Sequence, residues 1–102
     1  MSREPQLCLE DIIEGCDRVA GYIAGSKTVD AVIRQFEIIG EAVKNLPEEL
    51  KQKEPGIPWR QIAGFRDVLV HSYFAVDESV VWDAASGKAP ELREACLRLT
   101  RR

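Results

Sequence analysis

Hydrophobic residues recur at intervals of three and four along most of the chain, which is the period of an α-helix with one buried face. Between residues 6 and 24 the pattern falls on Leu9, Ile12, Ile13, Cys16, Val19, Ala20 and Ile23. Gly25 then predicts the end of this helix. The same spacing returns at Val29, Val32, Ile33, Phe36, Ile39, Gly40, Val43 and Leu46. Ser26 or Thr28 is expected to cap this second helix.

The segment 54–58, Glu-Pro-Gly-Ile-Pro, cannot form regular structure and is predicted to be the main internal loop. Pro47 before it is a plausible start for a short helix, because proline is favoured in the first turn. Pro58 likewise suits the first position of a third long helix, which is expected to run to about Tyr73 or Phe74.

The rest of the chain predicts two more helical segments. Asp77 can cap a helix that runs through Ser86, and Gly87 and Pro90 are expected to break or kink it before a last helix over 90–101. No segment alternates with period two for long, so no sheet is expected. The pattern predicts one all-α domain over residues 1–102, an antiparallel helical bundle of four to six helices with short connections.

Composition narrows the possible partners. The 102 residues are 45 % hydrophobic and 30 % charged, with a net charge of −3, which excludes a protein that coats nucleic acid by bulk positive charge. Residues 1–55 hold seven basic and eleven acidic residues, whereas residues 56–102 hold seven and six, so an anion is expected to bind the second half. No apolar run is long enough for a membrane span and the N-terminus lacks the apolar region of a signal peptide. We therefore expect a cytoplasmic protein with no membrane partner.

Three cysteines, Cys8, Cys16 and Cys96, lack the paired spacing of a metal site. We expect them to be reduced and to act as small hydrophobic side chains. With a single histidine, the chain is not expected to bind zinc or another metal.

The predicted third long helix is apolar around most of its surface, yet it carries Arg66, Asp67, His71 and Tyr73. A small bundle has few places to cover such a helix completely, so a second copy of the chain is expected to cover part of it. Arg66 and Tyr73 are seven residues apart and nearly in line, whereas His71 lies roughly 140° around the helix from Arg66. Either the helix end is distorted, or a two-fold partner brings a second copy of these residues opposite the first.

The spacing Arg66-x4-His71-x-Tyr73 resembles the R-x4-H-x-Y signature of the HEPN superfamily, in particular its HepT-like branch. The flanking sequences Ile39-Gly-Glu-Ala, Pro58-Trp and Val81-Trp are also similar, so the resemblance covers roughly residues 6–101. It implies a helical bundle that forms a two-fold homodimer, with the signature lining a cleft at the interface.

The resemblance also implies a function. Active members are metal-independent endoribonucleases, and HepT-like members are toxins of type VII toxin–antitoxin systems. Their antitoxin is a minimal nucleotidyltransferase called MntA, which silences the toxin by transferring adenylyl groups from ATP to the signature tyrosine, here Tyr73. No cofactor of the toxin itself is implied, since ATP is used by the partner.

The residue types fit metal-free RNA cleavage by attack of the 2′-OH on the adjacent phosphate. Arg66 offers a planar fork for the phosphate oxygens, and His71 can exchange protons near neutral pH. Arg66 and His71 are thus the predicted catalytic residues. Asp67 is a supporting residue that departs from the asparagine often found there, and its carboxylate could either orient Arg66 or weaken RNA binding.

Simpler interpretations stand beside these. Arg66 could be only an ion-pair partner of Asp67 or Glu41, His71 could be structural, and Tyr73 could be an unmodified interfacial aromatic. The whole chain could then be a non-catalytic module that holds a nucleotidyltransferase or a nucleotide.

Other conspicuous side chains have ordinary interpretations as well. Trp59 and Trp82 are expected in the core or an interface. Glu37 and Glu41 are expected on a solvated face, or lining the cleft beside the third long helix.

Overall fold

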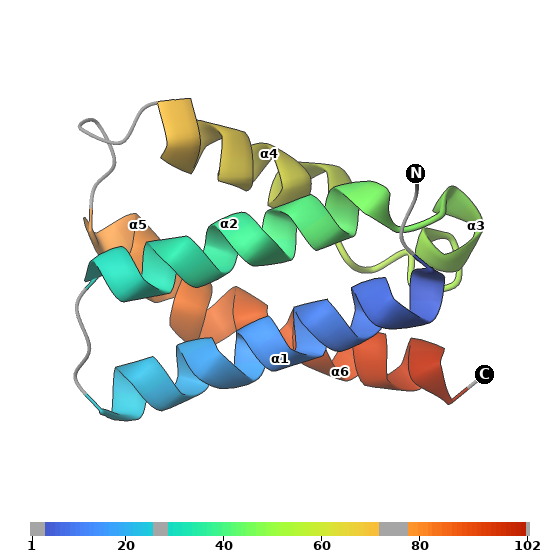
Figure 1. The fold of residues 1–102 in the computed structure, drawn as a ribbon, viewed down its shortest axis with the longest axis horizontal. Coiled ribbons are helices and arrows are strands. Elements are labelled where there is room, and N and C mark those ends of the chain that lie inside the picture. The colour runs from blue at the N-terminus through green and yellow to red at the C-terminus, as the bar shows by residue number, and fades with distance from the viewer. Residues whose placement is uncertain (1–3, 26–28, 72–77, 102) are drawn as a thin grey trace.

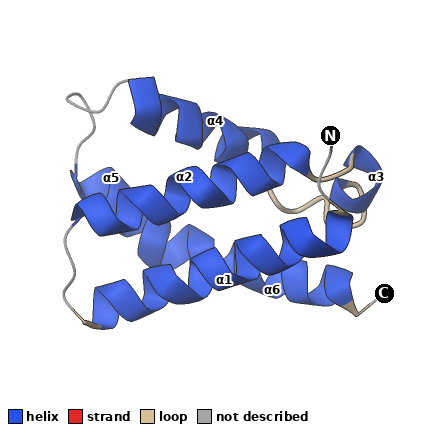
Figure 2. Ribbon diagram, viewed as in Figure 1, coloured by secondary structure: helices blue, strands red, loops and turns tan. Residues whose placement is uncertain are grey.

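The computed structural model describes residues 4–25, 29–71 and 78–101, and within these ranges every regular element is a helix (Figure 2). In chain order the elements are α1 (Pro5–Ala24), α2 (Val29–Asn45), α3 (Glu48–Lys51), α4 (Trp59–His71), α5 (Glu78–Asp83), the π-helical turn η2 (Ala84–Lys88) and α6 (Ala89–Thr100). The predicted all-α class is confirmed.

The long helices pack in a row in which each helix buries its apolar stripe against its neighbours. α2 lies between α1 and α4, and α1 in turn packs against α6 (Figure 1). α2 and α4 run in opposite directions, so the C-terminal turn of α4 lies beside the N-terminal half of α2 (Figure 1). The core between these helices contains Ile12, Val19, Val32, Ile39, Val43, Leu69, Val81 and Leu92, all of them buried.

The irregular segment before α4 is held at both ends by hydrogen bonds. The Trp59 indole Nε1 donates to the backbone carbonyls of Lys51 (3.0 Å) and Glu54 (3.1 Å). The Glu54 carboxylate is buried and accepts from Arg98 Nη2 at 2.8 Å and from Arg98 Nε at 3.1 Å. Trp59 and Glu54 therefore connect the start of α4 to the C-terminal part of α6. Trp59 is buried in the core, which is one of the two places predicted for it.

One predicted boundary needs correction, one is confirmed and the others are not described. α4 begins at Trp59 rather than Pro58, whose carbonyl instead accepts the first helical hydrogen bond from Ile62 N at 3.0 Å. Gly25 does follow the end of α1, but its φ of −90° is one that any residue adopts. The predicted helix ends at Tyr73 or Phe74, and the caps at Ser26, Thr28 and Asp77, lie outside the described residues.

The chain does not break at Gly87 and Pro90. α5, η2 and α6 follow one another without an intervening loop, and the widened π-helical turn spans Ala84–Lys88. Pro90 lies in the first turn of α6, where its missing N–H costs no hydrogen bond of that helix. Of the two predicted outcomes, a break is not observed, and the helical path instead widens into a π-helical turn.

The three cysteines are free and buried in the core, as predicted for small hydrophobic side chains. Burial raises the pKa of the Cys16 thiol, and likewise that of Cys96, from 9.0 to about 12. At neutral pH these thiols are therefore protonated and unreactive. Across the described ranges, none of the helices is long and apolar enough to cross a membrane.

Candidate functional site

Arg66 lies at a close contact between α4 and α2. A Cβ atom built on Gly40 would lie 2.4 Å from Arg66 Cβ, 3.1 Å from Arg66 Cγ and 3.6 Å from Arg66 Cα. Any side chain larger than hydrogen at position 40 would therefore overlap Arg66. Gly40 lets the base of the Arg66 side chain rest directly on the backbone of α2.

Two carboxylates hold the Arg66 guanidinium. Glu41 Oε2, from α2, lies 3.4 Å from Arg66 Nε, and Asp67 Oδ1 accepts a hydrogen bond from Arg66 Nη1 at 3.2 Å. Arg66 Nε is buried and makes no hydrogen bond to any described residue, so the contact with Glu41 is an ion pair without hydrogen-bond geometry. The Arg66 side chain is 29 % exposed, whereas that of Glu41 is 51 % exposed.

A polar cleft of about 370 Å³ opens beside this arginine. Its lining combines Arg66 with one residue of α1 and one face of α2: Asp11, Arg34, Glu37, Ile38, Glu41, Ala42 and Asn45. The residues from α2 recur at intervals of three and four, which places them along one face of that helix. Glu37 and Glu41 line this cleft, and the Glu41 side chain is also 51 % exposed, so the two predicted alternatives do not exclude each other.

Sequence reasoning missed three polar members of this lining, Asp11, Arg34 and Asn45. The signal was present for Arg34, which is seven residues before Glu41 and so lies on the same helical face. For Asp11 no local signal existed, because it belongs to α1 and reaches the cleft only through helix packing.

The side chains of two other predicted site residues, His71 and Tyr73, lie outside the described part of the structure. His71 is the last residue of α4, and only its helical backbone is described. Tyr73 lies outside the described residues. The backbone of α4 is α-helical from Trp59 to His71.

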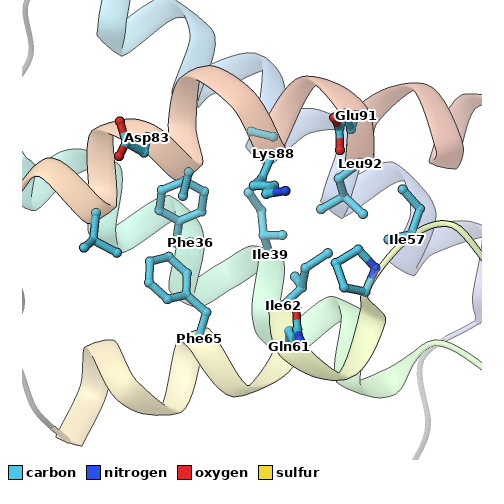
Figure 3. A pocket seen from close by; sticks show the side chains of 14 residues that line it. Phe36, Ile39, Ile57, Gln61, Ile62, Phe65, Asp83, Lys88, Glu91 and Leu92 are labelled. Carbon is cyan, nitrogen blue, oxygen red and sulfur yellow. The ribbon is translucent and has the colours of Figure 1, made fainter.

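A second, apolar groove of about 370 Å³ flanks the contact between α2 and α4 on its other side. Phe36 and Ile39 of α2, Ile62 and Phe65 of α4, and Leu92 of α6 point into it (Figure 3). The Phe36 and Phe65 rings meet edge to face with centroids 5.6 Å apart. Phe36 and Phe65 thus join α2 and α4 beside the contact between Gly40 and Arg66, Phe36 one turn before Gly40 and Phe65 next to Arg66.

Within the described ranges, no cluster of three or more His, Cys, Asp or Glu side chains could hold a metal ion. The Arg66 guanidinium can bind an anion such as phosphate, and the surrounding carboxylates can accept hydrogen bonds.

Comparison with known proteins bears on this site. Residues 7–99 match the protein-family model described as "HepT-like: Ribonuclease HepT-like". The chain is 38 % identical over 101 residues to "Putative RNase TTE0752" of Caldanaerobacter subterraneus subsp. tengcongensis, covering 90 % of each chain. It is 44 % identical over 88 residues to "Probable ribonuclease HepT" of Thermococcus cleftensis, covering 86 % of this chain and 71 % of that one. No solved structure gave a significant match.

Proposed function

The chain belongs to the HepT-like ribonuclease family, and on that premise we propose that it is an endoribonuclease that cleaves RNA without a metal ion. The observation that carries the proposal is the Arg66 guanidinium, which lines a polar cleft from a helix whose last residue is His71. Arg66 and His71 are the proposed catalytic residues, and Asp67 supports Arg66 through the 3.2 Å hydrogen bond.

In the proposed reaction the ribose 2′-oxygen forms a bond to the adjacent phosphorus and the bond from phosphorus to the 5′-oxygen breaks. The products are a 2′,3′-cyclic phosphate and a free 5′-hydroxyl. His71 is suited to move protons in this reaction: a base accepts one from the 2′-OH, and an acid donates one to the leaving oxygen. Arg66 stabilises the charge that develops on the phosphate oxygens.

We propose further that the active species is a homodimer. α4 packs against α2 but leaves Val68 49 % exposed, with Ile62 and Phe65 only partly buried. A second copy would cover these side chains and place two arginines and two histidines in one cleft. On a regular helix, residues 66 and 71 lie roughly 140° apart around the axis, and a two-fold partner would bring a second copy of both residues opposite the first. Sedimentation showing a monomer at micromolar concentration would contradict this proposal.

The proposed regulator is an MntA-like nucleotidyltransferase antitoxin that adenylylates Tyr73, which makes this chain the toxin of a type VII toxin–antitoxin pair. The Tyr73 phenolic oxygen would bond to the α-phosphorus of ATP, pyrophosphate would leave, and the phenolic proton would pass to a base. The added nucleotide brings bulk and negative charge within two residues of the end of α4, which repels the RNA backbone.

Intact mass after co-expression with a minimal nucleotidyltransferase of this type tests the regulator and the modified residue together. A mass gain in AMP units that disappears in Tyr73→Phe is expected. A gain that persists in Tyr73→Phe would place the modification elsewhere, and no gain would remove this partner.

One observation favours a second candidate function, a non-catalytic module that holds a nucleotidyltransferase or a nucleotide. Arg66 is already engaged by Glu41 and Asp67, and the cleft lining holds the acidic residues Asp11, Glu37 and Glu41 beside its two arginines. Growth arrest on expression and cleavage of RNA by the purified protein, both lost in Arg66→Ala and His71→Ala, support the nuclease. If expression is harmless and the purified protein cleaves no RNA, the binding module is the correct function.

A further inference from the structure

Two consecutive residues of α2 hold opposite ends of the Arg66 side chain. Gly40 contacts its base, since a Cβ atom there would overlap Arg66 Cβ at 2.4 Å. Glu41 contacts its head, with Oε2 at 3.4 Å from Nε. An arginine side chain has many rotamers, and fixing both ends removes most of them before a ligand arrives.

The two carboxylates around Arg66 belong to different helices. Asp67 is the next residue on the same helix, so its position relative to Arg66 hardly depends on how the helices pack. Glu41 belongs to a different helix, and its distance from Arg66 depends on the packing of α2 against α4. Since Arg66 Nε makes no hydrogen bond to any described residue, Glu41 is its principal electrostatic partner there.

We propose that Gly40 and Glu41 are positioning residues that set the place and direction of the Arg66 guanidinium for phosphate binding. This inference rests on the proposed nuclease function. Preorganised charges stabilise a transition state without reorganising during the reaction, and small displacements of such groups reduce rates strongly. Gly40 defines where the side chain starts, and Glu41 defines which edge of the guanidinium turns to α2.

Glu41 also adds a negative charge near the phosphate, which opposes RNA binding. Its side chain is 51 % exposed, so water and salt screen this repulsion. Its attraction to Arg66 acts over 3.4 Å at a buried nitrogen, where screening is weaker. The positioning effect is therefore expected to exceed the repulsion, and the sign of the change in Glu41→Gln tests this directly.

The test compares Glu41→Gln with Glu14→Gln in RNA cleavage by the full chain. Glu14 is a matched control, because it forms an exposed ion pair with Arg18 on α1 and does not line the cleft. Glu41→Gln should lower kcat/KM about tenfold to a hundredfold, chiefly through kcat. Glu14→Gln should stay within about twofold of the unmodified chain.

A second measurement does not depend on catalysis. The Arg66 Nε–H resonance, assigned by its absence in Arg66→Lys, should shift in Glu41→Gln and stay in place in Glu14→Gln. If the unmodified chain cleaves no RNA, the nuclease proposal fails while this resonance still tests the contact.

Three results would overturn the inference: an unmoved resonance in Glu41→Gln, equal cleavage by the two glutamine variants, or faster cleavage by Glu41→Gln. The last would mean that Glu41 competes with RNA for Arg66 instead of positioning it.

Discussion

The close approach of α2 and α4 predicts the effect of replacing Gly40 with alanine. The new methyl group would start 2.4 Å from Arg66 Cβ, whereas ordinary van der Waals contact begins at 3.4 Å, so the two helices must separate by about 1 Å at this point. Arg66 Cβ is attached directly to the backbone of α4 and cannot move by a simple change of rotamer.

The expected loss of stability follows from two opposing contributions. Overpacking of this kind costs about 1–3 kcal/mol, and replacing glycine by alanine within a helix recovers about 1 kcal/mol. Because the obstruction is rigid, a net loss of about 1–2 kcal/mol is expected. For a domain of this size each kcal/mol lowers Tm by about 4–8 °C, so Tm should fall by roughly 4–16 °C.

Thermal denaturation followed by circular dichroism at one fixed protein concentration measures this change. Gly64→Ala is the matched control on α4, because a Cβ atom at position 64 would meet nothing within 4 Å. It should leave Tm unchanged or raise it, with a gain of up to about 1 kcal/mol. If Gly40→Ala melted at as high a temperature as Gly64→Ala, the close approach of the helices at Arg66 would be wrong.

Two further predictions concern the supports of the fold. Glu54→Gln should lower the free energy of unfolding in urea by about 1–3 kcal/mol, because the buried Glu54 carboxylate loses its charge-assisted hydrogen bonds from the half-exposed Arg98. The exposed pair lost in Glu14→Gln should cost less than about 1 kcal/mol, and equal losses would contradict the burial of Glu54. Above pH 9 the thiols of Cys16 and Cys96 lose their protons in the unfolded chain, whereas in the folded chain they keep them up to a pH of about 12. The free energy of unfolding is therefore unaffected by these thiols below pH 9. Above pH 9 it falls by about 1.4 kcal/mol per pH unit for each thiol. The decline should be shallower in a double alanine variant of the two cysteines, and parallel pH profiles would refute the burial of the thiols.

Much of the local structure could be predicted from the chain because it depends on local periodicity. The spacing of apolar residues in 6–24 and 29–46 matches α1 and α2, and the Pro-Gly-Ile-Pro sequence matches the irregular segment before α4. The behaviour at Gly87 and Pro90 could not be decided in advance. Both residues disfavour a regular helix, but whether the chain breaks or widens into a π-helical turn depends on what it packs against.

The candidate site divides in the same way. The identity and spacing of Arg66, His71 and Tyr73 are properties of the sequence alone, as is the resemblance that connects them with RNA cleavage. The ion pair of Arg66 with Glu41 was one alternative that the sequence left open, and tertiary structure decided it. Tertiary structure alone showed that Gly40 contacts Arg66 and that Asp11 and Arg34 share its cleft. Positions along one helix follow from its 3.6-residue period, whereas the register between two helices follows from the sum of many packing contacts, which no single segment of the chain contains.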